Sequence, residues 1–453
     1  MTKTDHFDNR TDMQPAIFSR TVPRGRFHLI GATLAFKLSL DIIYIFYMNK
    51  FFADHFLTAM PLNVNPIHYV ISTILALIPS CFVPYGKKSF SGVFFLLAIM
   101  FAHIPMTVMY GLNDELSMAP LLAAILAIFV AYIVSLETKT KIKIPVIANG
   151  ERAAIAISLV FIAVFVAVSI VSGAISLLDF NISRVYEFRS QASDLMDTGV
   201  FAYINLWAQK IFNPLLFVLA LYKRNIPMMV VSIGIQVYFF GITHHRSHLF
   251  VPLLIYLISL LFTRSISIPR LLFLTSVGLL GVLMLITILH LDTFAALILR
   301  RAIFVPASVS FDWFEFFIDK PKVYWADKLL AAGSSSEYTG QLLPRLLGNH
   351  MAEGKELNFN SGIIAAGFAQ AGVYGIIFYA AIFGAVLKFV NALIRRGVPA
   401  YVCAGLLVQP IAAGWTSSDL FSTLLSHGVI VGVVILWVLG KPSSPLPISE
   451  KNK

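Results

Sequence analysis

Long apolar runs separated by short polar stretches dominate this sequence. Most runs hold about 17 to 25 residues, the length that a helix needs to cross roughly 30 Å of hydrocarbon. Apolar and polar residues do not alternate within the runs, so the pattern favours helices over the strands of a barrel. Twelve membrane-spanning helices are predicted, at residues 28–52, 66–84, 91–111, 117–136, 153–178, 202–222, 226–243, 249–263, 271–289, 361–391, 399–415 and 420–440.

Basic residues gather in every second loop between these runs. The loops that carry them hold Lys87 and Lys88, Lys139 to Lys143 with Arg152, Lys223 and Arg224, Arg264 with Arg270, and Arg395 and Arg396. By the positive-inside rule these loops face the cytoplasm, and so do both termini. The sequence therefore predicts an all-α polytopic membrane protein with a cytoplasmic tail at 1–27, one transmembrane domain at 28–440 and a second cytoplasmic tail at 441–453.

Composition leads to the same class. Of the 453 residues, 58% are hydrophobic and 13% are charged, and the mean hydropathy is +0.81, which excludes an ordinary soluble protein. A net charge of +11 is compatible with nucleic-acid binding, but most of the excess lies in loops that set topology, so no nucleic-acid partner is expected. Cys81 and Cys403 lie inside apolar runs and far apart, and neither is expected to form a disulfide or bind a metal.

The longest polar stretch, residues 290–360, is predicted to be one large loop on the outer, periplasmic side. Asp312, Glu315 and Asp319 are spaced to share one face of a helix, which favours an amphipathic helix lying on the outer leaflet. His350 and Glu353 are candidate general bases, with Asp312 and Glu315 as further choices.

Several arginines fall in outer loops, where the topology rule disfavours basic residues. We interpret them as directed toward a ligand rather than toward membrane orientation. They are Arg184, Arg189, Arg246, Arg300, Arg301 and Arg345.

The short outer turn from Thr243 to His248 holds three histidines and Arg246. Metal binding is disfavoured, because adjacent histidines at a helix end point apart. A guanidinium makes bidentate contacts with phosphoryl oxygens, so Arg246 and His245 suit a phosphate or pyrophosphate group. The alternative is a cationic cluster that meets lipid headgroups.

A second outer segment, residues 181–197, places Tyr186 near Arg189. The aromatic ring is suited to stack on a sugar and the arginine to contact a phosphate. A solvated turn without a ligand is the alternative interpretation.

Within the first span, Lys37 and Asp41 are four residues apart and share a helix face, so they can neutralise each other. Charges inside a membrane are candidates for function, here proton transport, but a packing or insertion role fits equally.

The run Asn358-Phe-Asn360-Ser361-Gly, continuing to Gly367-Phe-Ala-Gln370 and Gly372-Val-Tyr-Gly375, resembles the segment that follows the large periplasmic loop of O-antigen polymerases of the Wzy type. In that family an Asn-Ser/Thr-Gly opening leads into a Gly-rich helix. The predicted span count, the outer His-Arg-Ser turn and the Tyr-Glu-x-Arg189 segment extend the resemblance over most of the chain.

The resemblance implies a GT-C-like, metal-independent glycosyltransferase of the bacterial inner membrane that needs no cofactor. It would transfer a growing O-antigen or similar polysaccharide from undecaprenyl pyrophosphate to the terminal sugar of a new lipid-linked unit. Membrane lipid and a chain-length regulator are the other implied partners. We assign His350, Arg246 and Arg345 as candidate catalytic residues. The candidate substrate-binding residues are Arg189, Tyr186, His245, Arg300, Arg301 and Asn360.

Two other functions remain open. The related O-antigen ligases carry a His-(Asn/Ser/Gln) pair upstream of their Gly-x-x-Gly, whereas this chain has Asn360 and Ser361, which favours a polymerase. A flippase of lipid-linked sugars should carry cationic groups through the depth of a central cavity, whereas only Lys37 lies deep here.

Overall fold

The computed structural model describes residues 24–55, 58–136, 145, 147–181, 185–196, 198–291, 296–328, 337–352 and 357–440. Regular structure in these residues is helical, and one isolated bridge pairs Asn63 with Asn113. The elements are α1 (Arg24–Ile43), η2 (Tyr44–Met48), α2 (Asn49–Phe52), α3 (Pro66–Leu77), η3 (Ile78–Cys81), α4 (Phe90–Ala98), η4 (Ile99–His103), α5 (Ile104–Leu112), α6 (Ala119–Ser135), α7 (Gly150–Val171), η5 (Ala174–Leu177), α8 (Val185–Met196), α9 (Gly199–Trp207), η7 (Ala208–Phe212), α10 (Asn213–Lys223), α11 (Ile226–Thr243), α12 (Ser247–Thr263), α13 (Ile268–Leu289), η8 (Ala296–Phe304), α15 (Val305–Ile318), α16 (Leu343–Met351), α17 (Ile363–Arg395), α18 (Ala400–Thr416), α19 (Leu420–Leu424) and α20 (Val429–Val438).

Eight helical segments in the described residues are long and apolar enough to cross a membrane, so the chain is a polytopic helical membrane protein. They are Arg24–Phe52, Phe90–Leu112, Gly150–Val171, Gly199–Lys223, Ile226–Thr243, Ile268–Leu289, Ile363–Arg395 and Leu420–Val438. Four shorter apolar helices coincide with the other predicted spans: Pro66–Cys81, Ala119–Ser135, Ser247–Thr263 and Ala400–Thr416. Because these four are shorter, the count of twelve spans stays a prediction, and so does the orientation in the membrane.

Capping side chains fix where several helices begin. Each accepts a hydrogen bond from a backbone N–H two or three residues later, which satisfies a donor that the first helical turn leaves open. The caps are Asn65 for α3, Ser89 for α4, Asn225 for α11 and Asp419 for α19, with donor–acceptor distances of 2.9, 3.0, 3.0 and 3.2 Å.

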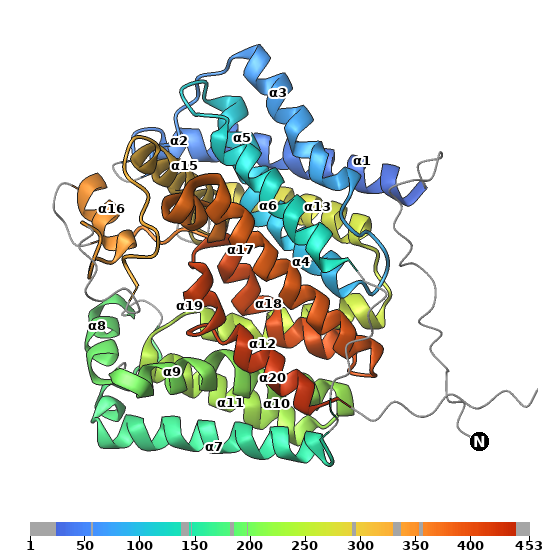
Figure 1. The fold of residues 1–453 in the computed structure, drawn as a ribbon, viewed down its shortest axis with the longest axis vertical. Helices are drawn as coiled ribbons and strands as arrows, with labels where there is room; N and C mark the ends of the chain where they lie inside the picture. The colour runs from blue at the N-terminus through green and yellow to red at the C-terminus, as the bar shows by residue number, and fades with distance from the viewer. Residues whose placement is uncertain are drawn as a thin grey trace, which may run out of the picture.

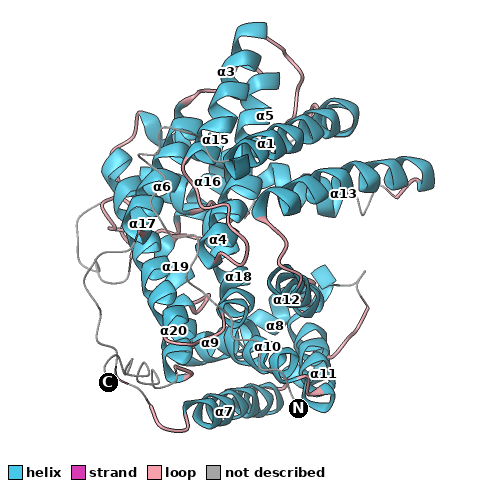
Figure 2. Cartoon of the chain, turned by 90° about the vertical axis from the view of Figure 1, so that its right-hand side faces the viewer, coloured by secondary structure: helices cyan, strands magenta, loops and turns pink. Residues whose placement is uncertain are grey.

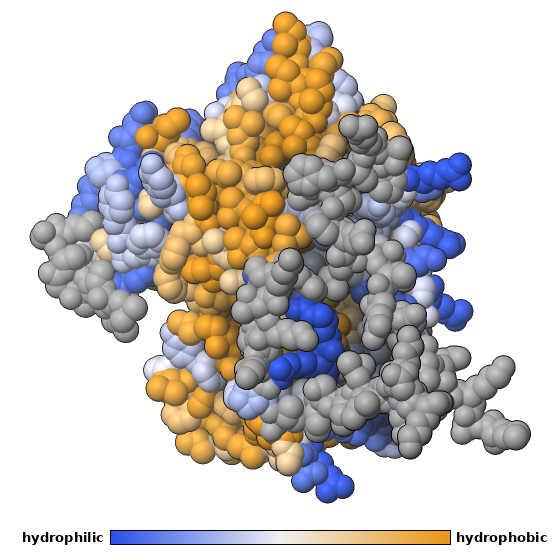
Figure 3. Space-filling model, turned by 45° about the vertical axis from the view of Figure 1, so that its right-hand side comes forward, coloured by the Kyte–Doolittle hydropathy of each residue, from blue (hydrophilic) through white to orange (hydrophobic). Residues whose placement is uncertain are grey.

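Figure 1 shows the helices side by side, with α1, α3 and α5 along one edge, α7 along the opposite edge, and α17 and α18 between them. In Figure 2, α13 lies next to α1 and away from α7. Helices α2, α8 and α16 gather at one end, on the left in Figure 1, and α1 begins at the other. Figure 3 shows apolar surface that runs from the top to the lower left of one face, with hydrophilic residues at the upper left, at the right and in a patch at the lower centre.

The glycine-rich run of the sequence forms a sharp bend in α17. Ala371 and Gly372 leave the helical conformation, with φ of −150° and +59°. The bend brings Gly367 against Gly375, and a Cβ atom on Gly375 would overlap the carbonyl group of Gly367. Residues 363–370 therefore form a short helix that folds back on the remainder of α17, and glycine is needed at both crossing points.

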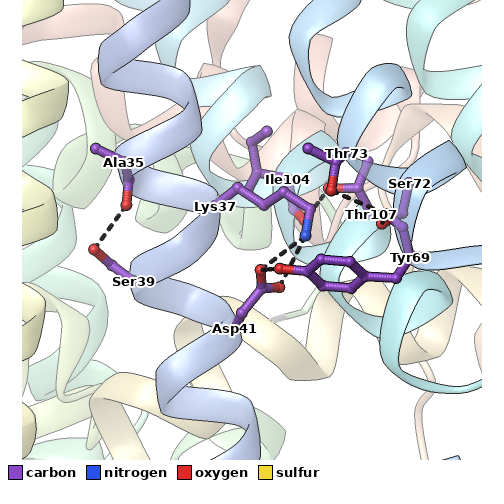
Figure 4. Close-up of polar contacts among 9 residues, drawn as sticks. All are labelled: Ala35, Lys37, Ser39, Asp41, Tyr69, Ser72, Thr73, Ile104 and Thr107. Atoms are coloured by element: carbon purple, nitrogen blue, oxygen red, sulfur yellow. Dashed lines mark hydrogen bonds and ion pairs between the residues drawn. The ribbon is translucent and has the colours of Figure 1, made fainter. Parts of the chain in front are cut away.

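The predicted pairing of Lys37 with Asp41 is confirmed inside the bundle (Figure 4). The Lys37 amine lies 2.8 and 3.1 Å from the two carboxylate oxygens of Asp41. Tyr69, on α3, donates its hydroxyl to Asp41 at 2.8 Å, and the amine lies 4.2 Å from the centre of the Tyr69 ring. Both charged side chains are buried, so the group joins α1 to α3 through satisfied polar contacts.

The helix predicted over residues 312–319 is present as part of α15, with Glu315 exposed, and its apolar residues pack on the bundle; its place on the outer leaflet stays a prediction. Helix α15 buries eight of its fourteen residues and packs against α17, α5 and α6. Phe314 stacks on Phe368 at 4.2 Å, and the Trp313 indole donates to the carbonyl of Phe359 at 2.9 Å. Acidic spacing alone could not show that large aromatic residues occupy the other faces of this helix and draw it into the bundle.

Candidate functional site

His244 attaches the turn between α11 and α12 to η5 of the same chain. This residue ends α11 in the left-handed conformation, with φ of +56°, and its ring bonds to the carbonyl of Leu177 at 3.1 Å. Burial lowers the pKa of His244, with smaller opposing effects from this hydrogen bond and from Asp179. His244 therefore serves as a neutral anchor of the turn.

The next residues of the turn meet two distant segments. The ring of His245 lies 5.7 Å from that of His248, and Lys210, on η7, lies close to His248. The Lys210 amine lies 3.2 Å from Nδ1 of His427, which precedes α20. Arg246 is half-buried in the same turn. We call Lys210, His245, Arg246, His248 and His427 the cationic cluster.

One member of the cationic cluster has an open hydrogen-bonding position. His248 is 2% exposed, and its Nδ1 lies 3.4 Å from the amide of Gln236. Gln236 in turn accepts a hydrogen bond from Asn213 at 2.5 Å, which fixes its orientation. Nε2 of His248 is buried with no hydrogen-bond partner among the described residues. A buried polar atom of this kind is costly unless a ligand or water satisfies it.

A second polar group links the 320–328 segment to α17 and α19. The Lys328 amine lies 2.7 Å from Asp327 and 3.3 Å from Asp419. Gln370 donates to Asp327 at 2.9 Å, and Tyr379 donates to Asp419 at 2.9 Å. We call these five residues, together with Trp325, the Asp419 network.

Electrostatics hold the Asp419 network together. Burial disfavours the charged form of Lys328, but the carboxylates of Asp419 and Asp327 outweigh burial and raise the pKa of this lysine above its usual value. Lys328 is therefore protonated at neutral pH and bridges two carboxylates. With two acids and one base, the network carries a negative balance, opposite to that of the cationic cluster.

The short helix α19, labelled in Figure 1, lies in the chain between Asp419 of one group and His427 of the other. Asp419 caps its first turn, and the backbone N–H of His427 donates to the carbonyl of Ser422 at 2.8 Å just after its end. Five helical residues span about 7.5 Å. The indole of Trp207 fixes the following turn by donating to the carbonyl of Leu425 at 2.6 Å. An acidic and a basic site thus lie at opposite ends of one short element.

Arg300, one of the two arginines predicted to bind substrate at the start of the large loop, contacts the chain around the end of α2. Arg300 lies 3.1 Å from Nδ1 of His55, bonds to the hydroxyl of Thr58 and stacks 4.7 Å over the ring of Phe52. Burial, with a smaller contribution from Arg300, lowers the pKa of His55. These contacts tie η8 to the chain after α2, a structural role. Arg301 is exposed.

The remaining predicted residues lie apart from the cationic cluster in the chain. Arg345 and His350 are exposed on α16, where the His350 ring lies 5.0 Å from that of Phe316 on α15. Asn360 is exposed just before α17. Tyr186 and Arg189 belong to α8, but their side chains lie outside the described part of the structure, as do Arg184 and Glu353 altogether.

Sequence reasoning found the turn that holds His245, Arg246 and His248, but it missed Lys210, His427 and the charged residues of the Asp419 network. Lys210 is a lone charge in a predicted span, the same signal that drew attention to Lys37, and it was available in the sequence. Asp327, Lys328, Asp419 and His427 carry no motif, and only the folded chain brings them together.

Among the described residues, no three His, Cys, Asp or Glu side chains are arranged to hold a metal ion. No protein-family model, curated protein or solved structure matches the chain. Fold and site together define a polytopic helical membrane protein with a cationic cluster and an acidic network on either side of α19.

Proposed function

We propose that this protein is a glycosyltransferase that polymerises oligosaccharide units linked to undecaprenyl pyrophosphate, in the bacterial inner membrane with both termini cytoplasmic. O-antigen or a similar surface polysaccharide would be the product. One observation carries the proposal beyond the resemblance of residues 358–375: Lys210 meets three histidines, and Arg246 lies in the same turn as two of them. A pyrophosphate on a lipid chain reaches this cluster, because its tail lies among the apolar helices.

The chemistry that such a cluster serves is departure of a pyrophosphate. In the proposed reaction a hydroxyl oxygen of the acceptor sugar bonds to the anomeric carbon of the donor chain. The bond from that carbon to the phosphate oxygen breaks, and undecaprenyl pyrophosphate leaves with the electron pair. Negative charge grows on the leaving oxygen in the transition state, and fixed cationic groups in partly dehydrated surroundings stabilise it. Arg246 and Lys210 are the proposed source of this stabilisation.

The other candidates keep proposed roles of different kinds. Arg345 and His350 are exposed on α16, where a long glycan can contact them, and His350 is the proposed proton acceptor. Arg300 is excluded from substrate binding in this proposal, since its described contacts are to His55, Thr58 and Phe52.

The test is the ladder of lipopolysaccharide lengths in cells that depend on this protein. Arg246→Ala should reduce polymerisation by about 100-fold or more, the usual effect of losing one preorganised charge-stabilising group, and should leave core bearing one repeat. Arg264→Ala is the matched control, because Arg264 is an exposed arginine at the opposite end of the same helix, α12. A full ladder in cells carrying Arg246→Ala would refute the role of the cluster. Bare core in cells without the protein would indicate a ligase or flippase instead.

A further inference from the structure

Two consecutive aromatic residues in the 320–328 segment adopt a strained backbone. Tyr324 and Trp325 have φ of +48° and +61°, a region that side chains other than glycine rarely occupy. Three hydrogen bonds to the bend of α17 hold them there. The N–H groups of Val323, Tyr324 and Trp325 donate to the carbonyls of Ala369 and Gln370 and to the Gln370 side chain at 3.0, 2.8 and 2.6 Å. Strain maintained by so many contacts is typical of functional sites.

The two rings of the strained turn have different surroundings. The Trp325 indole turns inward, donates to the Tyr379 hydroxyl at 3.1 Å and lies 5.6 Å from Phe378. The Tyr324 ring turns outward and is 69% exposed. Folding of the turn explains the place of Trp325, but none of the contacts that hold the turn uses the Tyr324 ring.

Lys328 of the Asp419 network lies in the same turn as Tyr324, because its backbone N–H donates to the carbonyl of Trp325 at 3.0 Å. The side chains of Lys328 and Asp419 are 27% and 17% exposed, so ligand atoms can reach them, whereas Asp327 is 5% exposed. An aromatic face beside an amine donor and carboxylate acceptors matches a sugar, which offers an apolar ring face and several hydroxyls. The negative balance of the network repels pyrophosphate.

We infer that Tyr324, Lys328 and Asp419 form a binding site for the neutral acceptor sugar, separate from the cationic cluster that receives pyrophosphate. The inference rests on the proposed function and deepens it. Tyr324 stacks on the sugar ring, while Lys328 and Asp419 bond to its hydroxyls. Helix α19, about 7.5 Å long, sets the spacing between the acceptor sugar and the pyrophosphate.

Binding of two separate fragments tests this division. The protein is purified in lipid nanodiscs, and the lipid-linked oligosaccharide that accumulates in cells lacking it is collected. Mild acid releases its glycan, and undecaprenyl pyrophosphate without a sugar is the second probe. Affinity for each fragment is measured by titration calorimetry for the wild type and each variant.

Tyr324→Ala should weaken binding of the free glycan about tenfold, the usual scale for loss of one stacking ring, and leave affinity for undecaprenyl pyrophosphate unchanged. Tyr324→Phe keeps the ring and should retain binding within about twofold. Arg246→Ala should give the opposite pattern. Tyr256→Ala is the control for loss of a tyrosine, since Tyr256 is 46% exposed on α12 and outside both groups. Lys328→Gln supplies a second test that keeps a polar side chain and should also weaken only glycan binding.

The possible failures are distinguishable. Two outcomes would overturn this inference and leave the proposed function standing. In the first, Tyr324→Ala binds the glycan as tightly as the wild type does. In the second, the wild-type protein binds undecaprenyl pyrophosphate but no glycan. Protein that binds neither fragment, together with a normal polysaccharide ladder in cells carrying Arg246→Ala, would overturn the proposed function itself.

Discussion

Removal of Asp41 should destabilise the protein strongly, because it would leave a buried lysine without its counter-ion. The Lys37 side chain is 0% exposed and that of Asp41 is 5% exposed. In the fold, Lys37 bonds to both Asp41 oxygens and lies over the Tyr69 ring, and only the ring contact would survive Asp41→Ala. Removing one partner of a buried ion pair costs about 3–5 kcal/mol, so a loss of this size in the free energy of unfolding is expected.

Two further variants separate charge from hydrogen bonding. Lys37→Met combined with Asp41→Leu removes both charges and should recover most of the lost stability, because a well-packed apolar pair often replaces an ion pair at little cost. Tyr69→Phe removes one hydrogen bond to the carboxylate and should cost roughly 1.5–3 kcal/mol. Ser39→Ala is the control on the same helix, since the Ser39 hydroxyl bonds to the carbonyl of Ala35 one turn earlier (Figure 4).

Unfolding in mixed detergent micelles, followed by circular dichroism, gives these free energies. If Asp41→Ala is no less stable than Ser39→Ala, the argument from an uncompensated charge is refuted. If the double variant is as unstable as Asp41→Ala, packing rather than charge explains the effect. A double variant that folds normally but has lost activity would favour the alternative in which the pair moves protons.

Three more predictions concern other parts of the fold. Gly375→Ala should destabilise the protein by about 1–3 kcal/mol, because a Cβ atom there meets the Gly367 backbone. Gly234→Ala, whose Cβ atom meets open space on α11, is the control and should be neutral or slightly stabilising. Equal effects of the two variants on thermal melting would mean that the crossing is unimportant. Burial, with a smaller contribution from Glu315, raises the pKa of Asp312 to about 7. Between about pH 4 and pH 7 the folded protein therefore keeps a proton that the unfolded chain releases. The free energy of unfolding should fall by up to about 1.4 kcal/mol per pH unit as the pH rises through this range. Melting curves across that range should lose this slope in Asp312→Asn and keep it in Glu315→Gln, and an unchanged slope in the first would contradict the assignment. Lys328→Met should lower the free energy of unfolding by roughly 1–3 kcal/mol, since it removes the amine that bridges Asp327 and Asp419 in partly exposed surroundings. Lys328→Arg should retain most of this stability. A loss in Lys328→Met that does not shrink in high salt would argue against an electrostatic cause.

Hydrophobic pattern was sufficient to predict the helical class and the apolar segments, because lipid leaves a spanning backbone few alternatives to a helix. The i, i+4 spacing of Lys37 and Asp41 was likewise enough to predict their contact, since both lie on one face of one helix. Both predictions depend only on local geometry.

Contacts that depend on tertiary packing were beyond the sequence. The acidic spacing over 312–319 predicts a helix, but it does not show that Trp313 and Phe314 find partners in α17 and the preceding segment. The place of Arg300 in an outer loop likewise does not show that His55, about 245 residues away in sequence, is its neighbour. Long-range pairs of this kind leave no local signal in the sequence.

Substitutions of Asp419 can separate its role in placing α19 from the role of its charge. Its side chain caps α19 and also faces Lys328, so it both places the helix and contributes to the proposed sugar site. Asn caps helices as well as Asp does but lacks the charge, whereas Ala lacks both the capping group and the charge. Asp419→Asn should therefore weaken only glycan binding. Asp419→Ala should also weaken binding of undecaprenyl pyrophosphate, because α19 leads directly to His427 in the cationic cluster.

Equal effects of Asn and Ala on both ligands would mean that α19 does not couple the two sites. The structure argues for coupling, because Trp207 holds the turn after α19 and Tyr379 holds the residue before it, so the helix has little freedom to move at one end alone. Transfer between two bound groups is sensitive to displacements of about 1 Å, which can cost about 100-fold in rate. Asp419→Ala should consequently reduce polymerisation more than its two binding losses predict, and Asp419→Asn should not.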